Sequence, residues 1–394
     1  MPGLNILYVI TQGDLGGAQT YVRDLAASLA GRHQVSVAIG EPGTAQELTK
    51  QLAAAAPAVK IYPQRHLVRR ISPFHDAAAV LELSRLYREL RPDIVHLNSS
   101  KAGAVGSLAA LALRTRPAVV YTVHGWVFLE PLGPLRRALY RTVERSAAKN
   151  KNALIVLSEP DLATGRALIP PAGQSKLHLI PLGIAPTGRP ALTSRQARAK
   201  LACGRPETLH RWPFWVGCVA NLYPAKGLDT LLYAISRSSR ELTDTVFLIL
   251  GDGPEKTRLW ELRRRLNLQN NVLFLGAVPR ASELMPAFDL LVLPSRKEGL
   301  PYALIEAMQS GVPVLAAAVG GIPSLIADGV NGRLVPPDDP AALAGALAHA
   351  RREAAARESC AAAAKKTAAG YTLAAMIKKT ETLYEELRGR SGQA

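Results

Sequence analysis

The sequence predicts an α/β protein built from two doubly wound, Rossmann-like domains that face each other across a cleft. At 394 residues the chain is longer than one hydrophobic core usually supports. Short all-apolar runs recur along it, as expected for strands buried on both faces of a parallel sheet. Each run is followed by a loop and then by a helical segment, which is the pattern of repeated βα units.

The predicted boundaries divide the chain into four parts. We predict an N-terminal domain over residues 1–183, a linker over 184–213, a second domain over 214–369 and a C-terminal helix over 370–394. The linker prediction depends on a stretch rich in Pro, Gly and Arg. We expect the C-terminal helix to pack back toward the N-terminal domain.

The first domain contains about six predicted strands. Its apolar runs lie at residues 5–10, 35–39, 94–97, 119–123, 153–157 and 177–180. Helical patterns cover residues 18–30, 73–90, 101–113 and 135–150. Residues 61–70, which include Arg69, are interpreted as a basic loop.

The second domain repeats the pattern. Strands are predicted at residues 214–220, 246–250, 272–275, 290–293 and 314–319. Helices are predicted at residues 228–237, 282–287 and 301–310, in a segment that ends at residue 266, in one alanine-rich segment over 341–369 and in an amphipathic segment over 373–387.

Two carboxylates mark the strand, loop, helix and strand unit of residues 290–319. Glu298 lies in the loop after the strand, and Glu306 follows eight residues later, in a helix that Pro301 opens and Gly311 ends. Ligands of open α/β sheets bind outside the carboxyl ends of the strands. The spacing therefore predicts a ligand site in which both carboxylates take part.

Other candidate residues also follow predicted strands. The Gly16-Gly17 pair precedes a helix. Either it lets the backbone bind a phosphate or carboxylate, or it is only a tight turn between strand and helix. Lys101 stands at a helix start, as an anion ligand or as a solvated lysine beside a capping serine. His124 follows a strand, where it is either a residue that takes part in catalysis or substrate orientation, or a structural histidine of the core or of a cap. The glycine spacing does not match a dinucleotide fingerprint, which disfavours a nicotinamide enzyme.

Composition narrows the class of protein. The chain has three widely separated cysteines, Cys203, Cys218 and Cys360. Their odd number favours a reducing compartment, and their spacing, which is not that of metal ligands, argues against a structural zinc site. No run approaches the ~20 apolar residues of a membrane span. The N-terminus resembles a first strand rather than a signal peptide. We therefore expect a cytoplasmic protein, soluble or peripheral.

The net charge of +17 is concentrated in the first half of the chain, where residues 1–183 hold 21 Lys and Arg against 12 Asp and Glu. A positively charged half of this kind can bind either nucleic acid or an anionic membrane surface. We favour the membrane and expect no nucleic acid, because aromatic residues are only 5% of the chain and do not interleave with the basic ones. The helix over 135–150 is basic and partly apolar, as an interfacial helix or a solvated face would be.

Several motifs in order resemble one family. They are Gly16-Gly17-Ala18, Val219-Ala220-Asn221-Leu222 with Lys226-Gly227, Gly251-Asp252-Gly253-Pro254-Glu255, Glu298 and Glu306 in E-x7-E spacing, and Gly320-Gly321-Ile322-Pro323. Together they resemble the retaining glycosyltransferases of family 4, which have the GT-B fold. Residues 96–103 (HLNSSKAG) and 121–128 (YTVHGWVF) look like the subgroup that builds bacterial capsule, exopolysaccharide, O-antigen or N-linked glycans on undecaprenyl-diphosphate carriers.

The resemblance implies a nucleotide-sugar donor, UDP-linked in our prediction, and no bound metal or other cofactor. Glu306 would accept hydrogen bonds from the ribose, and Lys226, helped by Arg296, would face the diphosphate. Glu298 would contact the donor sugar, and His124 would orient or polarise it. Lys226, Glu298 and His124 are thus the implied catalytic residues. The implied donor-binding residues are Gly16, Gly17, Asn221, Lys226, Gly253, Val278, Glu298, Gly299, Leu300 and Glu306.

The implied acceptor is a lipid-linked saccharide or polysaccharide, reached from the inner face of the plasma membrane. Ser99, Ser100, Lys101 and Arg69 would bind it, with Lys101 near its diphosphate. The chain departs from the family in having Asn221 where an Arg is frequent. A sugar-nucleotide epimerase of the same fold and a non-catalytic binder of anionic surfaces are the alternative functions.

Overall fold

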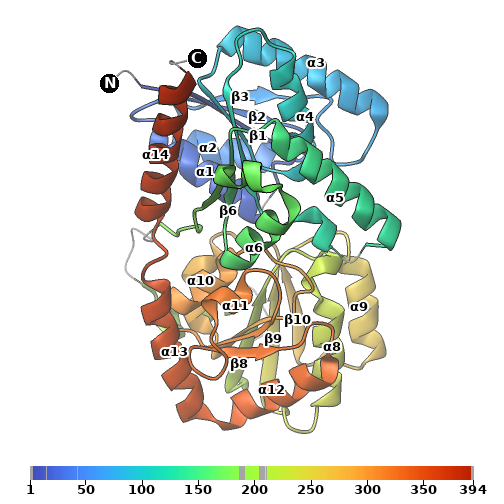
Figure 1. The fold of residues 1–394 in the computed structure, drawn as a ribbon. Coiled ribbons are helices and arrows are strands. Elements are labelled where there is room, and N and C mark those ends of the chain that lie inside the picture. Colours follow the sequence, from blue (N-terminus) through green and yellow to red (C-terminus); the bar gives the residue numbers. More distant parts are fainter. Residues whose placement is uncertain are drawn as a thin grey trace. The chain divides into compact units, whose positions relative to one another are not determined.

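The computed structural model describes residues 3–14, 16–41, 43–130, 132–185, 191–203, 209 and 211–391. They form two compact units, with Met1–Ala185 and Leu373–Ala394 in unit 1 and Pro186–Thr372 in unit 2. Each unit is a parallel sheet with helices on both faces (Figure 1). The prediction of two Rossmann-like α/β domains is confirmed.

Unit 1 contains a seven-stranded sheet in the order β3-β2-β1-β4-β5-β6-β7. Its strands are β1 (Asn5–Ile10), β2 (Gln34–Ile39), β3 (Lys60–Pro63), β4 (Ile94–Leu97), β5 (Ala118–Val123), β6 (Ala153–Val156) and β7 (Leu177–Leu179). All pairs are parallel, so every strand delivers its following loop to the same edge of the sheet. The central strands β4, β5 and β6 are buried along their whole length, which explains their apolar runs.

The helices of unit 1 connect these strands. They are α1 (Gly17–Leu29), α2 (Ala45–Ala55), α3 (Pro73–Leu90), α4 (Ser100–Leu111), α5 (Pro134–Lys149), α6 (Glu159–Leu168) and α14 (Leu373–Ser391), with the short turns η1 (Val127–Leu129) and η2 (Pro171–Lys176). Start signals in the sequence explain several of them. Pro73 occupies the first turn of α3, and the Ser99 hydroxyl caps α4 by accepting a hydrogen bond from the N–H of Ala102.

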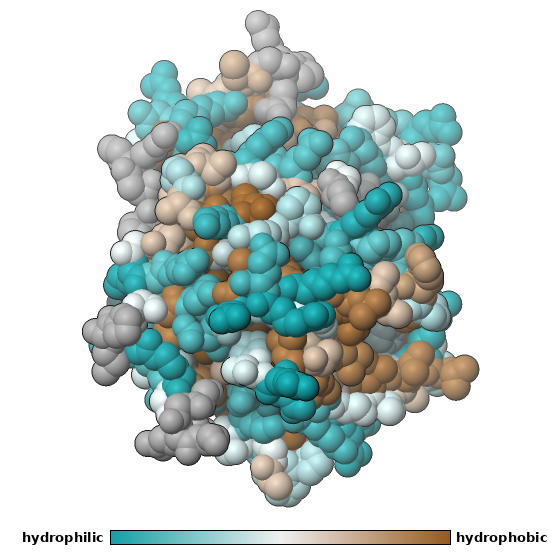
Figure 2. Space-filling model, turned by 90° about the horizontal axis from the view of Figure 1, so that it is seen from above, coloured by the Kyte–Doolittle hydropathy of each residue, from teal (hydrophilic) through white to brown (hydrophobic). Residues whose placement is uncertain are grey.

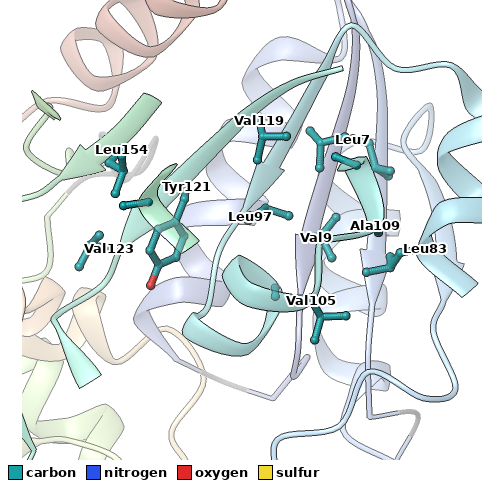
Figure 3. Close-up of a cluster of buried hydrophobic side chains, with 14 of the residues drawn as sticks. Leu7, Val9, Leu83, Leu97, Val105, Ala109, Val119, Tyr121, Val123 and Leu154 are labelled. Atoms are coloured by element: carbon teal, nitrogen blue, oxygen red, sulfur yellow. The ribbon is translucent and has the colours of Figure 1, made fainter. Parts of the chain in front are cut away.

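The core of unit 1 lies between the sheet and helices α3 and α4. Leu7 and Val9 of β1, Leu97 of β4 and Val119 of β5 meet Leu83, Val105 and Ala109 of these helices (Figure 3). The small residues of α4 permit this contact. A Cβ on Gly103 would lie 3.0 Å from the Tyr121 ring, and one on Gly106 would lie 2.5 Å from Leu97. The small-residue helix therefore brings its first turn close to the carboxyl ends of β4 and β5.

Unit 2 contains a six-stranded parallel sheet in the order β10-β9-β8-β11-β12-β13. Its strands are β8 (Phe214–Val219), β9 (Thr245–Leu250), β10 (Val272–Gly276), β11 (Leu290–Leu293), β12 (Val314–Ala317) and β13 (Arg333–Val335). Its helices are α7 (Ser194–Ala202), α8 (Leu228–Arg237), α9 (Lys256–Arg265), α10 (Tyr302–Gln309), α11 (Ile322–Leu325), α12 (Pro340–Arg352) and α13 (Ala354–Ala368), with the turns η4 (Pro224–Lys226) and η5 (Ala281–Ala287). Its core centres on β8, β9, β11 and the apolar face of α8.

The structure corrects the linker prediction. Residues 194–202 form α7, a helix of unit 2 with a Thr193-Gln196 capping box. Arg198 of this helix donates to the carbonyl of Ala287 and pairs with Asp289 at 2.5 Å. The linker prediction is wrong for these residues, because it depended on the Pro, Gly and Arg content of the segment and not on the capping box that begins the helix. Residues 186–190, 204–208 and 210 of the predicted linker lie outside the described residues.

Two further predictions of local structure are wrong. Residues 60–63 form the edge strand β3, which is only partly buried and so lacks the apolar run of an inner strand. The alanine-rich segment is two helices rather than one, since the chain turns at Glu353 (φ −94°, ψ 73°). The turn lets α12 pack on α8 and α13 pack on α10. No Gly or Pro marks this turn in the sequence, because tertiary packing determines it.

Helix α14 belongs to unit 1. Its Glu381 accepts hydrogen bonds from Arg32 at 2.9 Å and lies 2.8 Å from Nε2 of His33. Its Met376, Tyr384 and Leu387 are buried. Among the described residues, no helix has both the length and the apolar character that a bilayer crossing requires.

Candidate functional site

Four loops of unit 2 meet where strands β9, β8, β11 and β12 end, because these strands are neighbours in the sheet. The loop after β8 is joined to the loop after β9 by the bond from the N–H of Leu222 to the carbonyl of Asp252 (3.0 Å). It is joined to the loop after β11 by the bond from the N–H of Arg296 to the carbonyl of Ala225 (2.8 Å). The loop after β12 then approaches the loop after β11. The predicted motifs of this domain are therefore adjacent in space.

The Gly320-Gly321 turn lies directly against the Glu298 loop. Gly320 has a φ of +54°, and a Cβ there would lie 1.8 Å from the carbonyl oxygen of Glu298. The N–H of Gly321 donates to the carbonyl of Gly299 at 2.8 Å. Only glycine permits both the left-handed backbone and this close approach. The turn therefore fixes the backbone from which the Glu298 side chain projects.

Lys226 and Glu298 form an ion pair at the centre of these loops. The Lys226 ammonium lies 2.7 Å from Oε1 and 2.9 Å from Oε2 of Glu298, and the Ser295 hydroxyl donates to Oε1 at 2.7 Å. The Glu298 side chain is only 8% exposed, whereas that of Lys226 is 26% exposed. A carboxylate this enclosed needs such partners. The pair holds both groups in place, and part of the Lys226 side chain remains open to solvent.

Two backbone donors follow Glu298. Among the described residues, no group accepts a hydrogen bond from the N–H of Gly299 or of Leu300. Both residues are buried, and they precede the Pro301 cap of α10. Adjacent N–H groups at a helix start suit an anion.

Arg296, which we expect to help Lys226 at the diphosphate, has two acidic partners in the structure. Its guanidinium pairs with Asp229 at 2.9 Å and with Asp338 at 2.5 Å, and it also donates to the carbonyl of Pro224 at 2.8 Å. These partners satisfy the charge of Arg296 and pin the β8 loop to the β11 loop. No local signal in the sequence pointed to Asp229 and Asp338 as its partners, and the role of Arg296 at a diphosphate stays a prediction. Lys226 is the residue that forms an ion pair with Glu298 directly.

The other predicted donor-site residues of unit 2 occupy the same edge or the helix behind it. Glu306 is half-buried on α10, two turns after Glu298. Asn221 follows β8, Gly253 follows β9 and Val278 follows β10, and each is half-buried. A Cβ on Gly253 would lie 2.7 Å from the carbonyl oxygen of Leu222, so this glycine permits the contact between its loop and the next.

His124 of unit 1 follows β5 and is partly exposed, but its Nε2 is buried. Among the described residues, no group hydrogen-bonds to its ring. The edge-on ring of Tyr21 contacts it, with centroids 5.0 Å apart and planes at 80°. Burial lowers the pKa of His124 to about 4, so the imidazole is neutral near pH 7.

Gly16 and Gly17 lie at the start of α1, after strand β1. Gly16 is the N-cap residue, with the extended backbone that any residue adopts there (φ −175°). The first-turn amides of α1 therefore begin at the same sheet edge as the loop that carries His124.

The predicted acceptor residues of unit 1 lie at this edge, but several already have partners. Ser99 caps α4 and lies 2.6 Å from the Thr11 hydroxyl, and the Ser100 hydroxyl lies 3.4 Å from that of Tyr121. Lys101 forms an ion pair with Asp76 of α3. Arg69 follows β3, where its backbone N–H donates to Glu41 at 2.9 Å. The positive charge at the α4 start is therefore balanced in the absence of a ligand.

Sequence reasoning missed Ser295, Asp76 and Tyr21. Ser295 lies three residues before Glu298 in the loop after β11, so its proximity was a local signal in the sequence. Asp76 and Tyr21 had no such signal, because each meets its partner across a distance of 25 residues or more. Among the described residues, no group of three or more His, Cys, Asp or Glu is arranged to hold a metal ion.

A pH effect on stability arises from His96, the histidine of β4 beneath this edge. Burial lowers its pKa from 6.5 to about 3. The unfolded chain takes up a proton below pH 6.5 that the folded chain refuses until about pH 3, so stability falls as the pH falls through this window. We expect a loss of about 1.4 kcal/mol per pH unit from this residue. Urea unfolding between pH 5.5 and pH 4, where the slope is fully developed, measures it, and His96→Gln should reduce the slope by that amount. An unchanged slope in the variant would contradict the prediction.

Comparison with known proteins identifies the two units. Residues 15–187 match the model of "Glycosyltransferase Family 4", and residues 210–367 match that of "Glycosyl transferases group 1". The chain belongs to the glycosyltransferases. Unit 1 thus carries the family 4 domain and unit 2 the group 1 domain, and the loops around Glu298 lie in the latter.

Individual relatives cover most of this glycosyltransferase. It is 28% identical, over 82% of each chain, to the UDP-Gal:alpha-D-GlcNAc-diphosphoundecaprenol alpha-1,3-galactosyltransferase of Escherichia coli. Among solved structures, sucrose-phosphate synthase of Thermosynechococcus elongatus has a TM-score of 0.82 at 22% identity, covering 98% of this chain and 99% of that one. The Anabaena protein HepE, solved with UDP-glucose, has a TM-score of 0.79 at 23% identity, covering 97% and 100%. These structures establish the GT-B fold.

Proposed function

We propose that this glycosyltransferase moves a sugar from a UDP-linked donor to a lipid-linked saccharide, with retention of the anomeric configuration, in bacterial cell-surface polysaccharide assembly. The observation that carries the proposal is the Lys226–Glu298 pair beside the open N–H groups of Gly299 and Leu300. An ammonium and two amides at one point suit the charge that develops on a leaving diphosphate. The named activities of the galactosyltransferase relative and the UDP-glucose complex of HepE support the donor and acceptor classes.

In this proposal the donor binds along the four loops of unit 2. Glu306 accepts hydrogen bonds from the ribose hydroxyls, and Gly253, Asn221 and Val278 line the nucleotide. The Lys226 ammonium has three protons and two carboxylate contacts, so one proton remains for a phosphate oxygen. Lys226 then neutralises the diphosphate while Glu298 keeps its partner Ser295.

Glu298 of unit 2 and His124 of unit 1 each keep the role toward the donor sugar that the family resemblance implies. The enclosed Glu298 carboxylate accepts hydrogen bonds from sugar hydroxyls, and a hydroxyl also provides the partner that Nε2 of His124 lacks. The acceptor hydroxyl attacks from the face that the diphosphate leaves, so the new bond keeps the configuration of the old one. Its proton passes to the departing phosphate oxygen, and neither carboxylate has to act as the base.

The proposed reaction needs no bound metal, because Lys226 and the loop amides supply the positive charge. The acceptor diphosphate is assigned to the start of α4, with Ser99, Ser100, Arg69 and Lys101. A diphosphate there competes with Asp76 for the Lys101 ammonium. We place this acceptor, and hence the enzyme, at the inner face of the plasma membrane.

The test is a transfer assay with a panel of sugar nucleotides and lipid-diphosphate saccharides. We expect one UDP-sugar to give product in the presence of EDTA, and proton NMR to show the same anomeric configuration in donor and product. Release of no nucleotide with any pair would refute the proposal. Conversion of UDP-N-acetylglucosamine without an acceptor would instead favour an epimerase.

Helix α5 supplies the membrane contact in this proposal. Leu135, Leu139 and Val143 recur every fourth residue and are 85%, 55% and 40% exposed, and arginines at 136, 137, 141 and 145 are exposed beside them. The helix lies at the right of unit 1 in Figure 1, and the right-hand side of the face in Figure 2 carries hydrophobic side chains bordered by hydrophilic ones. An apolar stripe beside arginines fits an anionic bilayer surface. Lys151, which follows the helix, is buried and does not belong to this surface.

Charge reversal on α5 tests this contact. Each basic residue near an anionic surface contributes about 1 kcal/mol, so Arg137→Glu with Arg141→Glu should lower sedimentation with phosphatidylserine-containing vesicles by about tenfold or more. Arg264→Glu with Arg265→Glu is the matched control, since these arginines are exposed on α9 of unit 2. Equal binding by both double variants would count against α5 as the contact.

A further inference from the structure

A chain of buried polar side chains joins α14 to the sheet of unit 1. The Tyr384 hydroxyl hydrogen-bonds to Nδ1 of His96, and Nε2 of His96 lies 2.7 Å from the Thr122 hydroxyl. Thr122 donates to the Tyr21 hydroxyl at 3.3 Å. The side chain of Thr380 lies beside the Tyr21 side chain, and its own hydroxyl donates to the carbonyl of Met376 at 2.8 Å. All five side chains are fully buried. Because Thr380 and Tyr384 are one turn apart on α14, that helix supplies both ends of the chain.

Because the network is buried, its polar groups need hydrogen-bond partners within the protein. A buried hydroxyl or imidazole without a hydrogen-bond partner destabilises the fold, so each member of the network is held where its neighbours require it. The low pKa of His96 keeps its ring neutral, and therefore one ring nitrogen donates and the other accepts. The α14 helix is also fastened from outside by the pairing of Glu381 with Arg32 and His33. The position of Tyr21 thus depends on a helix more than 350 residues later in the sequence.

Tyr21 is also the aromatic neighbour of His124. Its ring meets the His124 imidazole edge to face, at 5.0 Å between centroids. Among the described residues, no hydrogen bond fixes the imidazole, so this ring contact is the specific restraint on its orientation. Tyr21 lies one turn after Gly17 on α1, and it therefore couples the glycine turn, the imidazole and α14.

We propose that Tyr21 is a positioning residue for His124, and that Thr380 and Tyr384 make the C-terminal helix a working part of the site by holding Tyr21. The inference rests on the proposed role of His124 at the donor sugar. Tyr21 touches neither donor nor acceptor in it. Its ring excludes water from one side of the imidazole and sets the direction of Nε2, which keeps His124 neutral and aimed.

The test compares hydroxyl-deleting variants that keep the shape of each side chain. Tyr21→Phe and Thr380→Val each remove a buried hydroxyl from this cluster, Thr380→Ser keeps the hydroxyl, and Lys379→Ala alters only the exposed face of α14. The readouts are the titration of the His124 imidazole by NMR, assigned with His124→Gln, and the separate values of kcat and donor KM. Thermal unfolding identifies any variant that has lost its fold.

We expect His124 of the unaltered protein to titrate near pH 4. In Tyr21→Phe and Thr380→Val it should titrate at least about one pH unit higher, because water reaches a looser ring. The same variants should lower kcat by about tenfold with donor KM nearly constant, since a misdirected group costs turnover more than binding. Thr380→Ser and Lys379→Ala should behave as the unaltered protein.

Folded Tyr21→Phe and Thr380→Val variants with an unchanged His124 titration would overturn the inference, and so would equal effects from Lys379→Ala. The NMR readout needs no substrate. If the imidazole responds but no variant differs in kcat, Tyr21 positions His124 and the role assigned to His124 in the proposed function is wrong.

Discussion

Glu298→Gln is expected to lower kcat by about 100-fold while changing donor affinity by less than about threefold. Glutamine keeps the size of the side chain and can still accept from the Ser295 hydroxyl, but it loses the charge that pairs with Lys226 and that we propose to contact the donor sugar. Charge stabilisation of this kind matters most when positive charge develops on the sugar during bond cleavage. The effect should therefore appear in turnover and not in the binding of the ground-state donor.

Steady-state kinetics and calorimetric titration of the donor separate these two quantities. Glu261→Gln is the matched control, because Glu261 is exposed on α9 of the same unit. Lys226→Met is expected to be less stable than the double variant with Glu298→Gln, since removing the cation alone leaves an enclosed carboxylate unpaired. A Glu298→Gln variant with a raised KM and normal kcat would show that Glu298 only binds the donor.

The inner strands and their helices were predictable because burial leaves a local trace in the sequence. Strands β4 and β11 and helices α3 and α8 have the predicted bounds. The predictions failed where local pattern and tertiary context diverge. The edge strand β3 is half-solvated, and the break between α12 and α13 occurs inside an alanine-rich run. In both cases packing against distant elements determines the structure.

The location of the site at the strand ends was predictable, but its electrostatics were not. Parallel topology alone brings Lys226, Gly320 and Glu298 to one edge. From the sequence we predicted that Lys226, Lys101 and Arg296 are unpaired cations that bind an anionic ligand. The structure pairs them with Glu298, Asp76 and Asp229. Such pairs join residues 25 to 72 positions apart in the sequence, so no local sequence pattern predicts them.

These pairs change the expected energetics of substrate binding. In the proposed function a diphosphate shares Lys226 with Glu298 and Lys101 with Asp76, so each cation should contribute less to affinity than a free one would. The pairs also hold the cations in place before the ligand arrives, which lowers the entropy lost on binding. Affinity for the donor should therefore depend strongly on groups that contact the nucleoside, and Glu306 is the first candidate among them.

Glu306→Ala is expected to weaken donor binding by about 10- to 100-fold and to change kcat at saturating donor by less than about threefold. A carboxylate that accepts from two ribose hydroxyls makes charge-assisted bonds, and these bonds are the same in the ground state and the transition state. The half-buried position of Glu306 on α10, two turns behind Glu298, suits this role. Ser310→Ala, at the exposed end of the same helix, is the control.

A ribose-modified donor shows whether the lost contact is the predicted one. If Glu306 binds the ribose, removing a ribose hydroxyl from UDP should weaken binding to the unaltered enzyme by about tenfold, yet have little further effect on Glu306→Ala. Additive losses would mean that Glu306 acts elsewhere. If instead Glu306→Ala and Glu298→Gln lowered kcat and affinity in the same proportion, the two carboxylates would share one task, and the division between a nucleoside clamp and a sugar contact would be wrong.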